Sequence, residues 1–456
     1  SISGIRGTIG GIPQENLTPF DIVSFTSAYG TWIAEHTDNP TRKIVIGRDA
    51  RISGEMVSSL VSQTLVALGY TVIDLGYAST PTTEIAVPME NADGGIIVTA
   101  SHNPKQWNAL KLLNNKGEFL NADQGAEIIA YTETPNMQFA DIDSIGKVIS
   151  NDSYNAIHIE QICNLPLVNR DAIQQANFTV AIDCVNSVGG IIIPELLKAL
   201  GVEKIIPLYC EPNGNFPHNP EPLPEHLTEI ANTMKSTDAD VGFVVDPDVD
   251  RLAIVNEDGS MFGEEYTLVS VADYILSHTP GNTVSNLSST RALQDITEKH
   301  GCSYSASAVG EVNVVDMMKK TNAIIGGEGN GGIIYPESHY GRDALVGIAL
   351  FLSHLATSQK TCSELRATYP QYVISKNKIE LTPETDVDKV IKEVQSLYAK
   401  ENISTIDGLK ISFETEWVHL RKSNTEAIIR IYAESNSHEK AHELAETMIK
   451  SIKKIV

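Results

Sequence analysis

Hydrophobic and polar positions follow the same order in three parts of the chain. In each part an apolar, strand-like run leads through a turn-rich loop into a stretch of helical periodicity, which ends at a glycine before a second strand-like run begins. Glycine often caps the C-terminal end of a helix, so this order is typical of a strand–helix–strand unit in a parallel or mixed sheet. The three units span residues 43–76, 178–209 and 283–307. Their spacing predicts three related α/β domains.

The C-terminal part of the chain has a different pattern. Strand-like runs at 376–382, 409–414 and 427–433 are combined with helical stretches at 386–400 and from Ser437 onward. This combination predicts a separate α+β domain.

Together these patterns predict an α/β fold class, in which three related α/β domains with mixed sheets precede a C-terminal α+β domain. The polar segment 133–154 is typical of a linker after the first domain. The expected domains span residues 1–150, 151–258, 259–370 and 371–456.

Composition and charge narrow the class of protein. The 456 residues include 58 Asp and Glu against 34 Lys and Arg, which gives a net charge of −24 spread without blocks of like charge. Such a field repels nucleic acid and anionic lipid, and no run reaches the roughly 18 apolar residues of a membrane span. Five scattered cysteines without close spacing are typical of reduced thiols, and the first residues show no secretory signal pattern. We expect a cytoplasmic monomer or homodimer with no nucleic-acid or membrane partner.

The first candidate site follows the apolar run 94–99. Ligands of open α/β sheets bind at the C-terminal ends of strands, which makes Ser101 a candidate nucleophile that accepts a phosphoryl group. A serine hydroxyl needs a base or a metal nearby, and His102 and Lys111 are close enough in sequence to supply cationic partners. The same residues would also fit an ordinary turn or helix cap.

The second candidate site follows the apolar run 241–245. Asp246, Asp248 and Asp250 alternate along an extended segment, where every second side chain points the same way. Three carboxylates at one point require a cation, and oxygen ligands alone are suited to Mg²⁺. The alternative is an acidic surface turn.

Three further segments carry groups that bind sugars or phosphates. The glycine-rich run 326–332 lets the backbone approach a ligand closely, and its Glu328 and Asn330 are able to bond sugar hydroxyls. Residues 421–426 offer a guanidinium, hydroxyls and backbone N–H groups for a phosphate, and Arg6 lies between glycines near the N-terminus. Each segment also fits an ordinary turn, hairpin loop or surface cap. The candidate phosphate-binding residues are Arg421, Ser423, Asn424, Thr425 and Arg430.

The four loops have matching chemistry and fall in successive domains, which predicts that the domains are arranged around one central cleft. With these motifs in this order, the sequence resembles the α-D-phosphohexomutase family over essentially the whole chain. The motifs that carry the resemblance are SGIRG (3–7), TASHNP (99–104), DPDVDR (246–251), GGEGNGG (326–332) and RKSNTEA (421–427).

The resemblance implies an intramolecular phosphotransferase, an isomerase that interconverts hexose 6-phosphate and hexose 1-phosphate. Ser101 would carry a phosphoryl group, and one Mg²⁺ per chain would bind to that group and to Asp246, Asp248 and Asp250. Hexose 1,6-bisphosphate would serve as intermediate and activator.

The resemblance also implies roles for the surrounding residues. Lys111 would act as general acid or base, and Arg6, His102 and Arg251 would stabilise charge around the phosphoryl group. Glu328 and Asn330 would bind the sugar, while the phosphate loop would hold the phosphate that does not react.

Two departures from the family pattern bear on the substrate. The motif G-E-x-S-G-H becomes residues 327–332 of this chain, where Gly332 replaces the histidine and Asn330 replaces the serine. The motif N-G-x-K becomes residues 108–111, which keeps the amine of Lys111. The GEGNGG form is similar to that of archaeal-type phosphoglucosamine and phosphomannose mutases. It favours conversion of glucosamine 6-phosphate to glucosamine 1-phosphate, with phosphomannomutase or phosphoglucomutase activity as the alternative.

Two other classes of function fit the same loops. A metal-dependent sugar phosphatase would pass the serine phosphate to water, and only exclusion of water separates it from a mutase. A non-catalytic sugar-phosphate sensor would explain the missing histidine but not the intact serine, lysine and aspartates.

Overall fold

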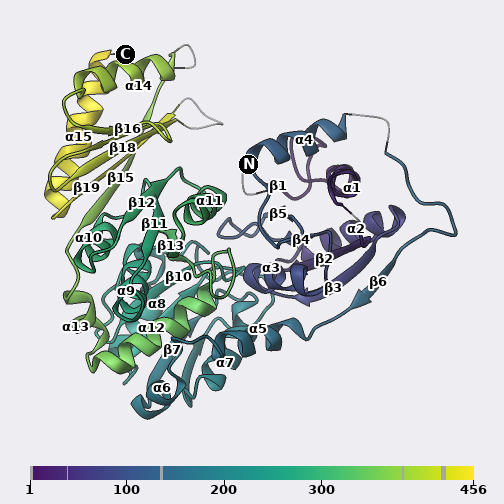
Figure 1. Ribbon diagram of the computed structural model, residues 1–456, viewed down its shortest axis with the longest axis horizontal. Helices are drawn as coiled ribbons and strands as arrows, with labels where there is room; N and C mark the ends of the chain where they lie inside the picture. Colours follow the sequence, from purple (N-terminus) through teal and green to yellow (C-terminus); the bar gives the residue numbers. More distant parts are fainter. Residues whose placement is uncertain (1–3, 39, 134–136, 383–384, 423–427, 456) are drawn as a thin grey trace.

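The structure is a computed structural model that describes residues 4–38, 40–133, 137–382, 385–422 and 428–455. Its strands form four separate sheets, one in each of four domains. Figure 1 shows the second and third domains side by side, with the first domain on one side of them and the C-terminal domain next to the third.

The first domain is built on a six-stranded mixed sheet in the order β1-β5-β4-β2-β3-β6. Alternate residues of each strand face opposite sides, so Ile44 and Ile46 pack with α1, α2 and α4, whereas Val45 packs with α3. The elements are β1 (Ile5–Thr8), α1 (Pro19–His36), β2 (Lys43–Arg48), α2 (Gly54–Ala67), β3 (Thr71–Tyr77), α3 (Thr80–Met89), β4 (Gly94–Val98), β5 (Trp107–Leu113), α4 (Ala122–Thr132) and β6 (Lys147–Ser150).

The second domain has a four-stranded sheet in the order β10-β9-β7-β8, in which only β10 runs antiparallel to its neighbour. Helices α5 and α7 pack against one face of this sheet and α8 against the other. The elements are α5 (Tyr154–Cys163), α6 (Arg170–Ala176), β7 (Thr179–Asp183), α7 (Gly189–Ala199), β8 (Lys204–Leu208), η1 (Pro224–His226), α8 (Thr228–Ser236), β9 (Val241–Val245) and β10 (Leu252–Asn256).

The third domain repeats this plan with the order β12-β11-β13-β14. Its helices α9, α10 and α12 belong to the same continuous hydrophobic core as α5 and α7 of the second domain, while α11 covers the opposite face. The elements are α9 (Glu264–His278), β11 (Asn282–Asn286), α10 (Ala292–Lys299), β12 (Tyr304–Ser307), α11 (Glu311–Thr321), β13 (Ala323–Glu328), β14 (Gly332–Ile334), α12 (Ala344–Ser358) and α13 (Cys362–Ala367).

The C-terminal domain is a five-stranded antiparallel sheet in the order β15-β19-β18-β17-β16. Two amphipathic helices, α14 and α15, supply the apolar residues that cover the sheet. The elements are β15 (Val373–Glu380), α14 (Val387–Leu397), β16 (Asn402–Ser404), β17 (Leu409–Ser412), β18 (Trp417–Lys422), β19 (Ile428–Ser435) and α15 (His438–Ile455).

The predicted fold class is confirmed. The three strand–helix–strand units correspond to β2–α2–β3, β7–α7–β8 and β11–α10–β12. One local expectation is wrong: the segment 133–154 is more than a linker, because β6 within it pairs in parallel with β3. The five cysteines are free thiols. Within the described residues, no helix has the length and apolarity needed to span a membrane.

Candidate active site

The serine loop follows β4 and holds Ser101 in a buried, constrained position. The residue has φ of 49°, in the left-handed region that few non-glycine residues adopt, and only 3% of its surface is exposed. Its backbone N–H donates to Thr99 Oγ1 at 3.0 Å, and its Oγ donates to Asp246 Oδ2 at 2.8 Å. The structure therefore brings the predicted nucleophile into contact with the metal loop.

Arg51 organises the serine loop and was not found from the sequence. It is fully buried behind the loop, and its Nε donates to Asp49 Oδ2 at 3.0 Å. Its terminal nitrogens donate to four backbone carbonyl oxygens of the loop, those of Ser101, Asn103, Pro104 and Trp107. The only signal in the sequence was an Asp-x-Arg pair at the end of β2, the strand that lies beside β4.

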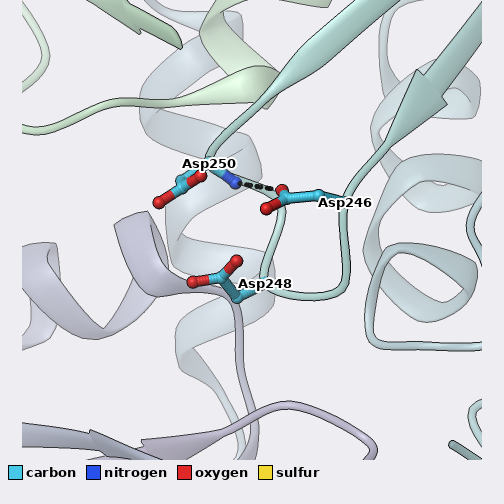
Figure 2. A group of neighbouring side chains, drawn as sticks. All are labelled: Asp246, Asp248 and Asp250. Carbon is cyan, nitrogen blue, oxygen red and sulfur yellow. Dashed lines mark hydrogen bonds between the residues drawn. The ribbon is translucent and has the colours of Figure 1, made fainter. Parts of the chain in front are cut away.

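The metal loop follows β9, and its three aspartates converge. Asp246, Asp248 and Asp250 are fully buried, and one ligand oxygen from each lies within 4.8 Å of the others. The backbone N–H of Asp250 donates to Asp246 Oδ1 at 3.1 Å, which curls the loop (Figure 2). The alternation expected from the sequence thus becomes a tight turn with the three carboxylates on its inner side.

The donor set fits a divalent cation. Asp248 Oδ1 and Asp250 Oδ1 are buried and accept no hydrogen bond from the described residues. Burial, followed by the neighbouring charges of Asp248 and Asp250, raises the pKa of Asp246 well above its usual range. Buried carboxylate oxygens without donors are costly unless a cation is bound, and hard oxygen ligands are those that Mg²⁺ prefers.

Lys111 connects the first domain to the metal loop. It lies on β5, is almost fully buried, and places Nζ 2.6 Å from Asp248 Oδ2 and 3.2 Å from Asp250 Oδ2. Burial disfavours its charge, but the two carboxylates outweigh burial and raise its pKa above the ordinary value. Thr80 Oγ1 also donates to Asp248 Oδ2 at 2.6 Å, so both groups hold the same carboxylate oxygen.

The other predicted cationic residues surround the serine loop. Arg6 donates to Asn103 Oδ1 at 2.7 Å, and Arg251 lies 3.9 Å from Asp250 Oδ1. His102 Nδ1 is 3.4 Å from Ser101 Oγ. Burial, and then the charges of Arg251 and Arg6, lower the pKa of His102 far below its usual value, so that this ring is neutral at pH 7.

The sugar loop follows β13 and contacts the metal loop through a second residue that the sequence analysis missed. Glu328 Oε1 accepts from Asn286 Nδ2 at 2.8 Å, and its Oε2 accepts from Arg342 Nη1 at 3.0 Å. Arg342 Nη2 in turn donates to Asp250 Oδ2 at 2.6 Å. Asn330 Oδ1 accepts from the backbone N–H of Gly332 at 3.2 Å, within the loop itself.

The phosphate loop lies on the C-terminal domain. Arg421 and Arg430 are cross-strand neighbours of β18 and β19, and Arg421 Nε donates to Asp407 Oδ2 at 3.0 Å. Within the described part of the chain, no hydrogen bond or ion pair joins either arginine to the serine or metal loop. Three of the predicted phosphate ligands lie outside the described residues: Ser423, Asn424 and Thr425.

Comparison with known proteins identifies the class that this fold and site define. Four domain families of phosphoglucomutase/phosphomannomutase match the chain in order: alpha/beta/alpha domain I at residues 2–138, domain II at 156–259, domain III at 263–372 and the C-terminal domain at 380–451. The chain therefore belongs to the phosphoglucomutase/phosphomannomutase family, whose members are phosphosugar mutases and hence isomerases. The resemblance seen in the five motifs is confirmed.

Individual relatives cover the chain from end to end. A phosphoglucomutase/phosphomannomutase of Thermococcus kodakarensis is 36% identical over 97% of both chains. A phosphoglucosamine/phosphogalactosamine mutase of Sulfurisphaera tokodaii is 31% identical over 99% of this chain and 98% of the relative. The crystal structure of a family protein from Burkholderia thailandensis superposes with a TM-score of 0.85 at 25% identity, covering 99% of this chain and 97% of that one.

Proposed function

We propose that this chain interconverts glucosamine 6-phosphate and glucosamine 1-phosphate through a phosphoserine at Ser101. The observation that carries the proposal is the hydrogen bond of 2.8 Å from Ser101 Oγ to Asp246, because it joins the nucleophile to the candidate metal ligands. The relative from S. tokodaii, named as a phosphoglucosamine/phosphogalactosamine mutase, supports an amino sugar as substrate. The relative from T. kodakarensis supports phosphomannomutase or phosphoglucomutase activity as the second candidate.

The proposed reaction consists of two phosphoryl transfers in opposite directions. In the first, the bond between Ser101 Oγ and phosphorus breaks as the free sugar hydroxyl forms a new bond to phosphorus, which gives a hexose 1,6-bisphosphate. After the bisphosphate turns end for end, its other phosphoryl group returns to Ser101 Oγ. Mg²⁺ held by Asp246, Asp248 and Asp250 would neutralise charge on the transferring group.

The surrounding residues would bind, orient and exchange protons. Lys111 would give or take the proton of the reacting hydroxyl, while Arg6, His102 and Arg251 would stabilise the phosphoryl oxygens. Glu328 and Asn330 would accept and donate hydrogen bonds to the sugar. Positioning of this kind provides most of the acceleration in phosphoryl transfer.

The phosphate loop would anchor the end of the sugar that does not react. Arg421 and Arg430 would bind the phosphate together with Ser423, Asn424 and Thr425 of the same loop. Because Arg421 is paired with Asp407 in this structure, a bound phosphate would compete with that carboxylate for the guanidinium.

The test is ³¹P NMR with Mg²⁺ and a trace of hexose 1,6-bisphosphate. Parallel samples hold glucosamine 6-phosphate, mannose 6-phosphate and glucose 6-phosphate. Growth of a 1-phosphate signal without inorganic phosphate supports the mutase, and the fastest sample identifies the sugar. Inorganic phosphate formed in step with substrate loss would instead indicate a phosphatase, and binding without turnover would indicate a sensor.

A further inference from the structure

Gly332, the residue at the position of the missing family histidine, has no room for a side chain. A Cβ atom built there would lie 2.4 Å from Arg342 Cδ and 3.1 Å from Arg342 Cγ. The backbone of Gly332 is outside the left-handed region, so its conformation alone does not require glycine. The side chain of Arg342 therefore fills the space that a larger residue at 332 would need.

Arg342 joins three carboxylates that come from separate segments. Its Nη2 donates to Asp250 Oδ2 at 2.6 Å, its Nη1 to Glu328 Oε2 at 3.0 Å, and its Nε to Glu311 Oε2 at 2.9 Å. Asp250 belongs to the metal loop. Glu328 is the last residue of β13, where the sugar loop begins, and Glu311 is the first residue of α11. All of these side chains are buried, so the guanidinium is shielded from competing water.

Arginine has the geometry that this position requires. Its planar group presents donors in fixed directions, which lets one residue hold several carboxylates at once, whereas lysine is a single point charge on a flexible stem. Without the cation, Asp250, Glu311 and Glu328 would be buried like charges that repel one another.

The backbone brings the same two loops together. Leu252, the first residue of β10 after the metal loop, donates its N–H to the carbonyl oxygen of Gly331 at 3.0 Å. Gly331 has φ of 84° and lies so close to Leu252 that a Cβ would meet its carbonyl oxygen at 2.3 Å. A displacement of the sugar loop would therefore be transmitted to the metal loop through both contacts.

We propose that Arg342 is a positioning residue that takes the place of the absent loop histidine, fixing the sugar-binding Glu328 against the metal-loop Asp250, and that Gly332 is glycine in order to admit it. This inference rests on the proposed function, because it gives Arg342 and Gly332 the role of aligning the sugar site with the metal site. A chain that lacks the histidine thus has the guanidinium of Arg342 between the two loops.

The first experiment compares R342M with R342K and with the control R366M. Arg366 is also partly buried in the third domain, but it donates to Phe262 O and lies over Tyr266, and within the described residues no hydrogen bond or ion pair joins it to either loop. We expect R342M to lower kcat by about 10- to 100-fold with a smaller change in KM, as when a residue that orients a metal ligand is lost. R342K is expected to keep part of the kcat that R342M loses. R366M is expected to leave kcat and KM unchanged. A kcat/KM of R342M within twofold of wild type, or equal losses in R342M and R366M, would overturn the proposal.

The second experiment tests the pairing of Gly332 with Arg342. G332A is expected to lower kcat in the wild-type background, because the methyl group displaces Arg342, and to have no further effect in the R342A background. G125A is the control, because a Cβ at Gly125 meets no atom within 4 Å. If the fold-losses of kcat in G332A and R342A multiply in the double variant, the two residues act independently, and the pairing of Gly332 with Arg342 is wrong.

A third measurement needs no turnover and separates this inference from the proposed function. Mn²⁺ is titrated calorimetrically into wild type, R342M and R366M. Loss of the residue that orients Asp250 is expected to weaken Mn²⁺ binding by about 10- to 100-fold in R342M alone. If wild type isomerises no sugar phosphate but this difference appears, the link to Asp250 stands and only the proposed function fails. Equal Mn²⁺ affinity in all three proteins would overturn the link itself.

Discussion

At the scale of single residues, Ser101 combines three constraints that rarely occur together. It is buried, its φ of 49° is unfavourable for a residue with a Cβ, and its hydroxyl is bonded to a candidate metal ligand. Arg51 holds the loop in this form through four backbone carbonyls. The loop is thus fixed before any ligand arrives, which favours positioning of the transferred group.

Removal of the hydroxyl therefore gives the first prediction. S101A is expected to lower turnover by about 10⁴-fold or more, as when the nucleophile of other enzymes is removed, without a large change in thermal stability. Turnover is followed by ³¹P NMR, with S236A, an exposed serine on α8, as the control. Unaltered activity in S101A would exclude both the mutase and the phosphatase.

The orphaned oxygens of Asp248 and Asp250 give the second prediction. Mg²⁺ at about 100 times its Kd is expected to raise the free energy of unfolding by about 2.7 kcal/mol, because it binds the folded state alone. D248N should remove most of this gain, while D171N on the exposed surface of α6 should keep it. Thermal unfolding with Mg²⁺ and with a chelator measures the difference, and an equal gain in D248N would argue against metal binding at these aspartates.

Residue types were the most predictable part of the site, and their partners the least. Ser101 and the three aspartates were found because a reactive group directly follows an apolar strand. Arg51 acts on residues about fifty positions away and Arg342 on Asp250, which is 92 positions away. The Asp-x-Arg pair is the one local signal for Arg51 and does not indicate these partners, so only the folded chain shows what the two arginines do.

At the scale of elements, α12 begins at an unusually well-supported cap. Asp343 accepts from the N–H groups of Leu345 and Val346, and also contacts His158 Nε2 at 2.9 Å and His339 Nε2 at 3.2 Å. Burial would raise the pKa of Asp343, but the two histidines outweigh it and hold the pKa below its ordinary value of 3.8. The capped helix lies in the core shared by the second and third domains.

The sign of this shift gives the third prediction. A carboxyl with a lowered folded-state pKa contributes stability above its ordinary value, and the contribution is lost as pH falls through the folded-state pKa. D343N is expected to destabilise the protein by about 3 kcal/mol at pH 7, because it removes the anion that the buried ring of His158 contacts, whereas His339 keeps Glu84 Oε2 at 3.3 Å. Urea unfolding of wild type and D343N should show the gap narrowing at acid pH; a gap independent of pH would contradict this account.

Helices and strands were predicted where their sequence pattern is local, and missed where they depend on pairing with a distant segment. The helices of the three strand–helix–strand units have an apolar stripe and a glycine cap, both of which are visible in sequence. Strand β6 is exposed along its whole length and pairs with β3 at the edge of the sheet. An edge strand of this kind has no apolar alternation, so its sequence looks like a linker.

At the scale of the whole molecule, the C-terminal domain is attached to the third domain by several polar contacts. Lys410 Nζ donates to Leu287 O at 2.7 Å, His419 Nδ1 lies 2.9 Å from Ser288 Oγ, and the N–H of Val309 donates to Asp407 at 2.9 Å. Asp407 also pairs with Arg421, so one carboxylate holds both the neighbouring domain and the candidate phosphate anchor.

This arrangement gives the fourth prediction. R421A is expected to raise KM for the sugar phosphate by about 10- to 100-fold, because a charge-assisted contact to phosphate contributes about 1.5–3 kcal/mol. D407N removes the competing carboxylate and should leave KM unchanged or lower it. Steady-state kinetics on both variants provides the test, and an R421A protein with the KM and kcat of wild type would show that the phosphate is anchored elsewhere.

The core that continues from the second domain into the third bears on how the chain can be recombined. These two domains resemble each other in plan, yet neither buries its apolar helices alone, so they should melt in a single calorimetric transition. A chimera that exchanges only one of them with a related mutase would join two half-cores that never packed against each other. Exchange of the pair as one block would keep this core together, and only its smaller apolar contacts with the first domain, such as those of Tyr154 and Ile157, would need to be matched.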